Sequence, residues 1–323
     1  MRYSENKKAC LEKLSNKDGV IAALAIDQRG SMEKMVTGFS DEERTKKIED
    51  FKTAVAKELT PYSSSILLDP LYGKKAVKAR DENCGLIMAY EITGFRDEFR
   101  QPEYLVGWSV KRLKDLGADA VKILLYYDVD DTEENNTPKK AFVERVGSEC
   151  VGEDIPFFLE IISYDKNMDD MKSKEYAKVR PFKVNQAVKE FVKPQYHVDV
   201  LKLETPVNMM FVEGYGEEAV YTKEEAKKFF KEQSDIANMP FIFLSGGVST
   251  ELFQDTLYFA KEAGSKFNGV LCGRATWKGG VPVFIENAEQ GNVWLKETGV
   301  QNIEDLNKVI KDTATPWTET LER

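Results

Sequence analysis

Residues 20–26 read Val-Ile-Ala-Ala-Leu-Ala-Ile, and Asp27-Gln28-Arg29-Gly30 follows them directly. A short apolar run that stops at polar and glycine residues is typical of a strand buried on both faces. The pattern returns seven more times along the chain. The eight runs occupy residues 20–26, 65–68, 85–90, 120–127, 155–162, 198–203, 241–244 and 269–271.

Amphipathic, charge-rich stretches separate these runs. Apolar residues recur at helical spacing in residues 41–59, 105–116, 178–192, 222–236 and 250–263. Ser40 is a suitable N-cap for the first stretch, and Gly117 and Gly264 are helix-stop signals. Strand and helix alternating eight times predict an α/β fold, a (β/α)8 TIM barrel. A doubly wound sheet is the competing architecture, but no G-x-G-x-x-G motif follows the first run.

The ends of the chain add helical material to this barrel. Residues 1 to about 18 are expected to form an N-terminal helix, and residues 275–323 a C-terminal helical extension. No linker rich in Pro, Gly or Ser divides the chain, so we expect residues 1–323 to form a single domain. The very acidic stretch 128–136 is interpreted as a solvated loop.

Composition excludes several classes of function. The 323 residues include 46 basic and 55 acidic ones, for a net charge of −9. A general nucleic-acid or anionic-membrane surface needs a basic face, so we expect neither partner. No run approaches the roughly 20 apolar residues of a membrane span. The expected partner is a small molecule, and a homo-oligomer is possible.

The cysteines and the single histidine narrow the chemistry. The four cysteines are far apart and form no C-x-x-C pair, which favours a reduced, cytoplasmic protein. His197 is the only histidine, so a multi-histidine metal site cannot be built within this chain. We therefore expect neither a metal nor a cofactor. His197 precedes the sixth run, away from the expected site, and is interpreted as structural or exposed.

Four ionisable residues interrupt the apolar runs. Side chains alternate between the two faces of a strand, and the apolar face should pack on the helices. This alternation turns Lys122, Glu160 and Lys202 into the barrel and places Asp27 at the end of the first strand. Active sites of this fold lie at the C-terminal ends of the strands. A buried ion-pair network that only fills polar space is the alternative interpretation.

This set of groups suits chemistry through an imine. A barrel lysine can form a Schiff base with a carbonyl once it becomes a neutral amine, which burial and a neighbouring ammonium both favour. Lys202, with Lys122 nearby, meets both conditions. Glu160 in an apolar setting is expected to have a raised pKa and to move protons. Asp27 is expected to hold a substrate hydroxyl or to position Lys122.

The last two strands are followed by residues suited to an anion. Residues 245–249 read Ser-Gly-Gly-Val-Ser, and Gly273-Arg274 follows the eighth run. Loops after strands seven and eight of such barrels often bind phosphate, so Ser245, Gly246, Gly273 and Arg274 are the candidates. An ordinary tight turn also explains the glycine pair. Arg29 is a candidate for a second anion.

The chain resembles the class I tagatose 1,6-bisphosphate aldolase family over nearly its whole length. The strings that carry the resemblance occupy residues 25–30 (AIDQRG), 64–70 (SSILLDP), 119–128 (DAVKILLYYD), 153–160 (EDIPFFLE), 199–204 (DVLKLE) and 269–277 (GVLCGRATW). The string at 244–249 departs from the family's in having Gly246 where alanine is expected.

The resemblance implies a TIM-barrel lyase of the tagatose 6-phosphate route of lactose metabolism. Such an enzyme cleaves tagatose 1,6-bisphosphate to dihydroxyacetone phosphate and glyceraldehyde 3-phosphate, and acts on related ketohexose bisphosphates such as fructose 1,6-bisphosphate. It implies that Lys202 forms the Schiff base, that Glu160 is the acid/base group, and that Lys122 and Asp27 support them. Gln28 enters as a substrate contact from the resemblance alone.

Three alternatives stay open at this stage. A related group with the same barrel and lysine cleaves 6-deoxy-6-sulfofructose 1-phosphate. A lyase or isomerase could instead hold Mg²⁺ on carboxylates. A non-catalytic barrel that binds a sugar phosphate and signals to a partner would be of a different class.

Overall fold

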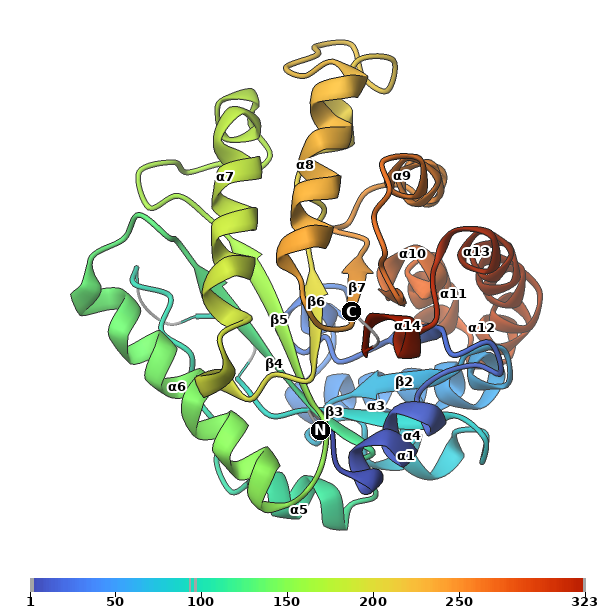
Figure 1. Cartoon of the computed structure of the whole chain (residues 1–323). Coiled ribbons are helices and arrows are strands. Elements are labelled where there is room, and N and C mark those ends of the chain that lie inside the picture. The colour runs from blue at the N-terminus through green and yellow to red at the C-terminus, as the bar shows by residue number, and fades with distance from the viewer. Residues whose placement is uncertain (1–2, 93, 96–97, 322–323) are drawn as a thin grey trace.

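The strands close into a barrel in which each strand is parallel to its neighbours. The computed structural model describes residues 3–92, 94–95 and 98–321 (Figure 1). Pairing runs from β1 through to β8, and β8 pairs back with β1. The predicted (β/α)8 barrel is confirmed. The strands are β1 (Ile21–Ala25), β2 (Ser65–Leu68), β3 (Gly85–Ala89), β4 (Ala120–Tyr127), β5 (Phe157–Ser163), β6 (Val200–Leu203), β7 (Phe241–Leu244) and β8 (Gly269–Cys272).

Helices surround the barrel, as Figure 1 shows. They are α1 (Glu5–Lys13), α2 (Gly30–Glu33), α3 (Asp41–Leu59), α4 (Lys74–Ala79), α5 (Val110–Asp115), α6 (Glu133–Gly152), α7 (Lys174–Phe191), α8 (Lys223–Ile236), α9 (Thr250–Glu262), α10 (Arg274–Trp277), α11 (Gly280–Glu286), α12 (Ala288–Trp294), α13 (Val300–Thr313) and α14 (Trp317–Leu321). The predicted N-cap Ser40 is confirmed, because its side chain accepts from the Glu43 amide. The helix expected over residues 105–116 is shorter, since Gly107 has φ +81° and Ser109 caps α5.

The acidic stretch 128–136 is not a solvated loop, so that prediction was wrong. Asp128 is 1% exposed and pairs with Lys183 of α7. Thr132 then caps α6, which begins at Glu133 and was not expected from the sequence. The sequence pattern does not show that a lysine from α7 pairs with this carboxylate. That buried lysine removes most of the free-energy cost of burying the carboxylate.

Two apolar cores follow from the alternation of side chains along the strands. An outer core lies between strands and helices, and an inner core fills the barrel. In β1, Ala22 and Leu24 belong to the outer core, whereas Ile21, Ala23 and Ala25 belong to the inner one. The other strands alternate in the same way between the outer and the inner core. This alternation determines which side chains face the barrel axis.

Both termini contribute to the inner core, and the predicted terminal helices are confirmed. Tyr3 and Leu11 from the N-terminal segment and Trp317 of α14 join the inner cluster. Tyr3 and Trp317 meet edge to face with ring centroids 6.5 Å apart. The Trp317 amide donates to the Gly19 carbonyl just before β1. These contacts close the end of the barrel where the strands begin.

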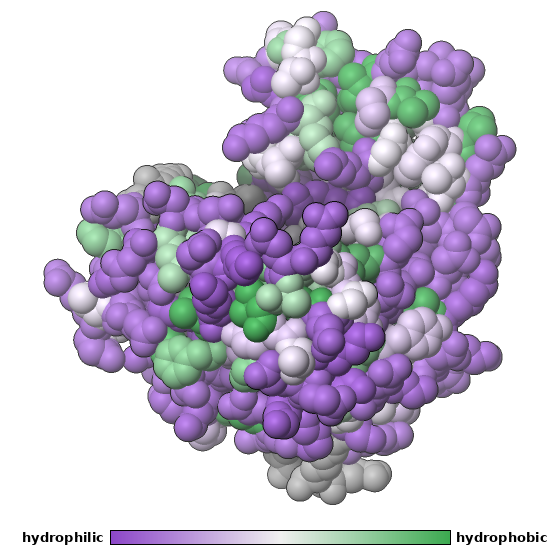
Figure 2. Space-filling model, turned by 90° about the horizontal axis from the view of Figure 1, so that it is seen from above, coloured by the Kyte–Doolittle hydropathy of each residue, from purple (hydrophilic) through white to green (hydrophobic). Residues whose placement is uncertain are grey.

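The face of the molecule seen from above is mostly polar. Seen from above, most side chains on view are hydrophilic, and the apolar ones appear in scattered groups around an indented middle (Figure 2). Among the described residues, no helix is both long and apolar enough to span a membrane.

Candidate active site

The four predicted ionisable residues meet inside the barrel. Lys122 lies on β4, Glu160 on β5 and Lys202 on β6, and each has the parity of an inner-core residue two positions before it. Asp27 follows β1 two residues after inner-core Ala25. The structure thus brings together all four side chains that the alternation turned inward.

Lys122 is the centre of this cluster. Its ammonium Nζ lies 2.7 Å from Glu160 Oε2, 3.0 Å from Glu91 Oε1 and 3.1 Å from Asp27 Oδ2. The side chain is 1% exposed. Burial disfavours its charge, but the three carboxylates outweigh burial and hold the pKa of Lys122 well above its ordinary value. Lys122 is therefore a fixed positive charge beside the site.

Glu160 bridges the two lysines. Its Oε1 lies 2.7 Å from Lys202 Nζ, and its Oε2 contacts Lys122. Burial by itself raises the pKa of this carboxyl, but the charges of Lys122 and then Lys202 outweigh burial, and the net shift of the Glu160 pKa is downward. The expected raised pKa was therefore wrong for the unliganded site, because a carboxylate between two ammonium groups is stabilised in its charged form.

Asp27, like Glu160, is buried among positive charges. Burial opposes its charge, but Lys122, Lys202 and Arg29 outweigh burial and lower the pKa of Asp27. In the unliganded site, Asp27 and Glu160 are therefore both charged near neutral pH.

Glu91 is a member of the cluster that sequence reasoning missed. It follows β3 two residues after inner-core Ala89 and is 3% exposed. Burial raises the pKa of Glu91, against the lowering effect of Lys122 and Arg29. The alternation that located the other four residues reaches Glu91 as well. It was overlooked because the third apolar run was taken to end at Tyr90.

The guanidinium of Arg29 is already engaged by Glu91 and is not open to an anion. Its Nη1 donates to the Glu91 carbonyl at 2.6 Å, and its Nη2 lies 3.4 Å from Glu91 Oε1. The side chain is 5% exposed. Arg29 therefore lies buried against Glu91, next to the charged cluster around Lys122.

The predicted anion loops lie together at the ends of β7 and β8. Gly246 and Gly247 have φ of +61° and +80°, which a residue with a side chain rarely adopts. A Cβ on Gly247 would lie 3.3 Å from Arg274 Nη2, so the two loops approach closely. Arg274 itself is exposed. This arrangement leaves backbone amides and a guanidinium close together.

Gln28 and Ser245 both lie beside the end of β8, next to Gly273 and Cys272 respectively. A Cβ on Gly273 would lie 3.3 Å from Gln28 Nε2, and Gln28 Oε1 is buried with no hydrogen-bond partner in the described part of the chain. Burial raises the pKa of the Cys272 thiol, while a hydrogen bond with Ser245 and the charge of Lys202 oppose the rise. Ser245 and Lys202 are therefore both neighbours of Cys272.

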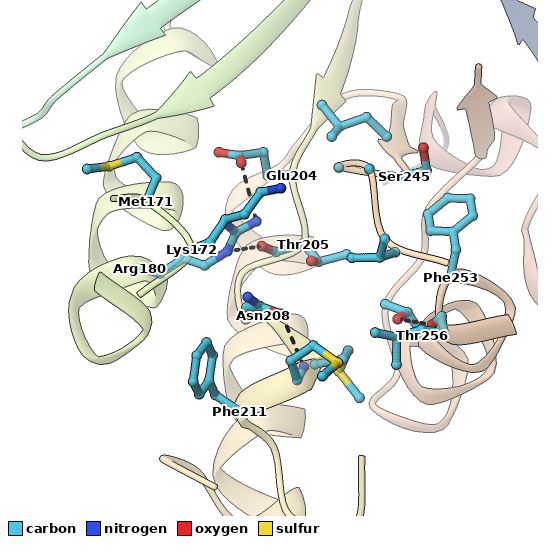
Figure 3. A pocket seen from close by; sticks show the side chains of 17 residues that line it. Met171, Lys172, Arg180, Glu204, Thr205, Asn208, Phe211, Ser245, Phe253 and Thr256 are labelled. Atoms are coloured by element: carbon cyan, nitrogen blue, oxygen red, sulfur yellow. Dashed lines mark hydrogen bonds and ion pairs between the residues drawn. The ribbon is translucent and has the colours of Figure 1, made fainter. Parts of the chain in front are cut away.

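A cavity of about 330 Å³ adjoins these loops (Figure 3). Its lining includes Arg180, Glu204, Ser245 and Gly246. Glu204 Oε1 lies 3.3 Å from Arg180 Nη2. The sequence does not reveal this cavity, because its lining comes from helices and loops whose approach to one another the strand pattern does not describe.

Carboxylates and the single histidine are the residues that could hold a metal ion. Within residues 3–92, 94–95 and 98–321, no group of three or more His, Cys, Asp or Glu side chains is arranged to hold a metal ion. His197 is exposed at φ +50°, before β6, which confirms its expected place away from the site.

Comparison with known proteins relates this barrel to aldolases. Two solved structures of Schiff-base or archaeal fructose 1,6-bisphosphate aldolases share the fold, at 15% and 14% identity and a TM-score of 0.58 each. They cover 93% and 94% of this chain and 99% of their own.

Sequence relatives are much closer. Proteins named tagatose 1,6-diphosphate aldolase from Staphylococcus aureus strains RF122 and JH9 are each 59% identical over 322 residues, which is 98% of this chain and 99% of theirs. A family model described as DeoC/LacD family aldolase matches residues 21–279. The resemblance noted in the sequence is thus confirmed, and the chain belongs to the DeoC/LacD family of aldolases.

Proposed function

We propose that this chain cleaves D-tagatose 1,6-bisphosphate to dihydroxyacetone phosphate and D-glyceraldehyde 3-phosphate through a Schiff base on Lys202. The observation that carries the proposal is the row Lys122–Glu160–Lys202, in which one carboxylate contacts both ammonium groups at 2.7 Å. The 59% identity to proteins named for this substrate supports the choice of sugar.

The first half of the reaction forms the imine. Lys202 passes a proton to Glu160, and the neutral amine attacks the C2 carbonyl of the ketose to give a carbinolamine. Glu160 then donates its proton to the C2 hydroxyl, which leaves as water, and an iminium remains on Lys202. Lys122 stays charged throughout, because three carboxylates stabilise it.

The second half breaks the carbon–carbon bond. Glu160, now a carboxylate again, takes the proton of the C4 hydroxyl, and the C3–C4 bond breaks with its electrons moving into the iminium. Glyceraldehyde 3-phosphate leaves as the aldehyde, and an enamine remains. Protonation at C3 and hydrolysis of the imine release dihydroxyacetone phosphate and restore the lysine. Asp27 orients a substrate hydroxyl and Lys122.

The anion loops supply binding. Ser245, Gly246, Gly273 and Arg274 are proposed to hold one phosphate of the sugar, with Gln28 beside them. The expected partner is thus a phosphorylated ketose. A cytoplasmic location is proposed because all four cysteines are free thiols.

Reductive trapping tests the imine. Dihydroxyacetone phosphate and borohydride should leave a stable adduct on Lys202, located by peptide mass spectrometry, and Lys202→Gln should abolish it. Absence of an adduct on any lysine, together with no cleavage of ketose bisphosphates, would refute the proposal.

Two further measurements separate the alternatives. The first compares the cleavage rates of tagatose bisphosphate, fructose bisphosphate and 6-deoxy-6-sulfofructose 1-phosphate under the same conditions. A preference for the sulfosugar phosphate would replace the proposed substrate. Exhaustive EDTA treatment should leave the rate unchanged, and a loss restored by Mg²⁺ would favour the metal-dependent alternative.

A further inference from the structure

Protonation of C3 is a step of the proposed reaction to which no residue has been assigned. C3 is bonded to C2, and C2 is bonded to the nitrogen of Lys202. The π electrons of the enamine form the new C–H bond, so the donor has to stand over one face of the intermediate. Glu160 contacts the Lys202 nitrogen itself at 2.7 Å, and ammonium groups hold both of its oxygens. The step therefore calls for a proton carrier displaced from the level of this pair.

The register of the strands shows which side chains lie one layer closer to the mouth of the barrel, where the strands end. Glu160 pairs with Lys202 on β6 and with Leu124 on β4, so these three residues share one layer. Two residues further along the same strands, Tyr126 pairs with Ile162. Two residues of a strand correspond to about 7 Å. Tyr126 thus stands one layer above the proposed Schiff-base lysine.

The side chain of Tyr126 faces the interior of the barrel. Its neighbours Leu125 and Tyr127 belong to the outer core, and side chains alternate along a strand. Lys122, four residues earlier, has the same parity as Tyr126 and contacts the carboxylates inside the barrel. Tyr126 is partly exposed, whereas Lys122 is buried. The phenol therefore lies between the buried charges and the solvent at the mouth.

The layer of Tyr126 offers two ionisable side chains on the strands from β4 to β7. Continuing the register places in it Tyr126, Ile162, Glu204 and Leu244. Both oxygens of Glu204 are already engaged, since Oε2 accepts from the Ser163 amide at 2.8 Å and Oε1 lies 3.3 Å from Arg180 Nη2. A carboxylate that accepts on both oxygens has no proton to donate. Tyr126 is the remaining proton carrier of this layer.

The ring of Tyr126 is held in place while its hydroxyl is left open. The Phe95 ring meets it edge to face with centroids 5.1 Å apart, and the guanidinium of Arg100 lies 5.7 Å from its centroid. In the described part of the chain the Tyr126 hydroxyl makes no hydrogen bond, unlike the hydroxyl of Tyr90, which donates to Glu149. A fixed phenol with an open hydroxyl suits a proton carrier, because it can both donate and accept.

The charges of the site act on this phenol. Burial and the charge of Glu160 raise the pKa of Tyr126, and the charges of Lys122 and Arg100 oppose the rise. The phenol therefore holds its proton near neutral pH, and two cations stabilise the negative charge that develops on its oxygen when the proton leaves.

We propose that Tyr126 is a catalytic residue that carries a proton from Glu160 to C3. After cleavage, Glu160 holds the proton that it removed from the C4 hydroxyl. When the aldehyde has left, the phenol O–H bond breaks, the π electrons of the enamine form the C3–H bond, and the iminium on Lys202 is restored. Glu160 then gives its proton to the phenol oxygen, so both groups return to their starting state. The inference rests on the proposed function and assigns one of its steps.

Tyr126→Phe removes the hydroxyl and keeps the ring. Dihydroxyacetone phosphate bound to Lys202 exchanges a hydrogen of its hydroxymethyl carbon, which is C3 of the sugar, with solvent deuterium through the same step, and proton NMR follows the exchange. We expect the exchange rate to fall at least 100-fold, because a general acid–base group contributes about 10²–10⁴-fold. Borohydride trapping of this compound on Lys202 should be unchanged, since imine formation comes before the proton transfer at C3.

Cleavage gives a second readout. Mixed rapidly with tagatose 1,6-bisphosphate, Tyr126→Phe should release about one equivalent of glyceraldehyde 3-phosphate in a burst, because bond cleavage comes before protonation of the enamine. Steady turnover should then be at least 100-fold slower than in the unmodified protein. A side chain that only supports the fold would lower the burst and the steady rate together.

Tyr127→Phe is the matched control. It removes the same hydroxyl from the adjacent residue of β4, whose ring packs outward on Phe191 with centroids 5.0 Å apart. The exchange rate and the cleavage rate should both stay within twofold of those of the unmodified protein.

A smaller fall of the exchange rate in Tyr126→Phe would overturn the inference and leave the step to Glu160 itself. Loss of trapping, loss of the burst, or an equal effect of Tyr127→Phe would also overturn it, because the hydroxyl would then act elsewhere. The unmodified protein keeps the two proposals apart. Its failure to trap or to cleave refutes the proposed function, whereas trapping and cleavage with normal exchange in Tyr126→Phe refute only the role of Tyr126.

Discussion

Lys122 contacts carboxylates that come from three different sectors of the barrel, namely Asp27 after β1, Glu91 after β3 and Glu160 on β5. Strand alternation located Lys122 and two of these partners from sequence, because the side-chain period of two is fixed by backbone geometry. It did not give the charge state of Glu160, which depends on how closely two lysines approach. That distance is a property of the closed barrel.

Replacing Glu91 with Gln tests whether it positions the charged groups of the site. We expect kcat to fall roughly 10- to 100-fold with little change in KM, because Lys122 and Arg29 lose a common anchor. The alkaline limb of the kcat–pH profile should move to lower pH, since one of three carboxylates that raise the pKa of Lys122 is gone. Steady-state kinetics across pH measure both effects.

A buried carboxylate elsewhere serves as the control. Asp199 pairs with Lys7 at 2.6 Å, just before the start of β6. Asp199→Asn should change the melting temperature without moving the pH profile. A normal kcat and an unshifted profile in Glu91→Gln would show that Glu91 has no positioning role.

At the scale of elements, local signals predicted best where a full capping box marks the start of a helix. Ser40 and Glu43 form a capping box at the start of α3, and Thr222 and Glu225 form one at α8. α6 was missed because Thr132 is followed by polar residues and its apolar face is weakly marked. What secures its start is the packing of Asp128 beneath α7, which involves residues 55 positions apart.

Ser40→Ala should destabilise the protein by about 1 kcal/mol, because the Glu43 amide loses its acceptor. Ser40→Gly should cost only a few tenths of that amount, since glycine is tolerated at an N-cap. Urea unfolding measures both variants, and kcat should be unchanged in each. Equal stability of the alanine variant and the unmodified protein would contradict a role for the cap.

At the scale of the whole molecule, the charged cluster links stability to pH. Lys122 lowers the pKa of Asp27 and of Glu160 despite their burial. A carboxyl with a depressed pKa in the folded state contributes stability above its unfolded pKa of about 4, and this contribution is lost as pH falls through the folded value.

We therefore expect the free energy of unfolding to fall below about pH 4 less steeply in Asp27→Asn than in the unmodified protein, by at most about 1.4 kcal/mol per pH unit. Chemical denaturation at a series of pH values measures the two slopes. Parallel curves would show that Asp27 is not stabilised in its charged form.

The terminal segments close the end of the barrel where the strands begin. Trp317 is 2% exposed and packs on Tyr3. Trp317→Ala should cost about 3–5 kcal/mol of stability, because it empties a large buried volume. Dihydroxyacetone phosphate trapping at low temperature should persist, since the active site lies at the opposite ends of the strands. Loss of trapping in a folded variant would show that the two ends are coupled.

Because of the contacts of Lys122, enzymatic turnover indicates whether the barrel has closed. Its partners lie up to 95 residues away from it in the chain, so they cannot assemble before distant strands are in register. During refolding, helical signal should return early from local segments, while activity should appear only with the last strand pairing. Recovery of activity thus reports closure of the barrel. A circularly permuted chain that regains its helical signal but leaves the barrel open should show no cleavage activity.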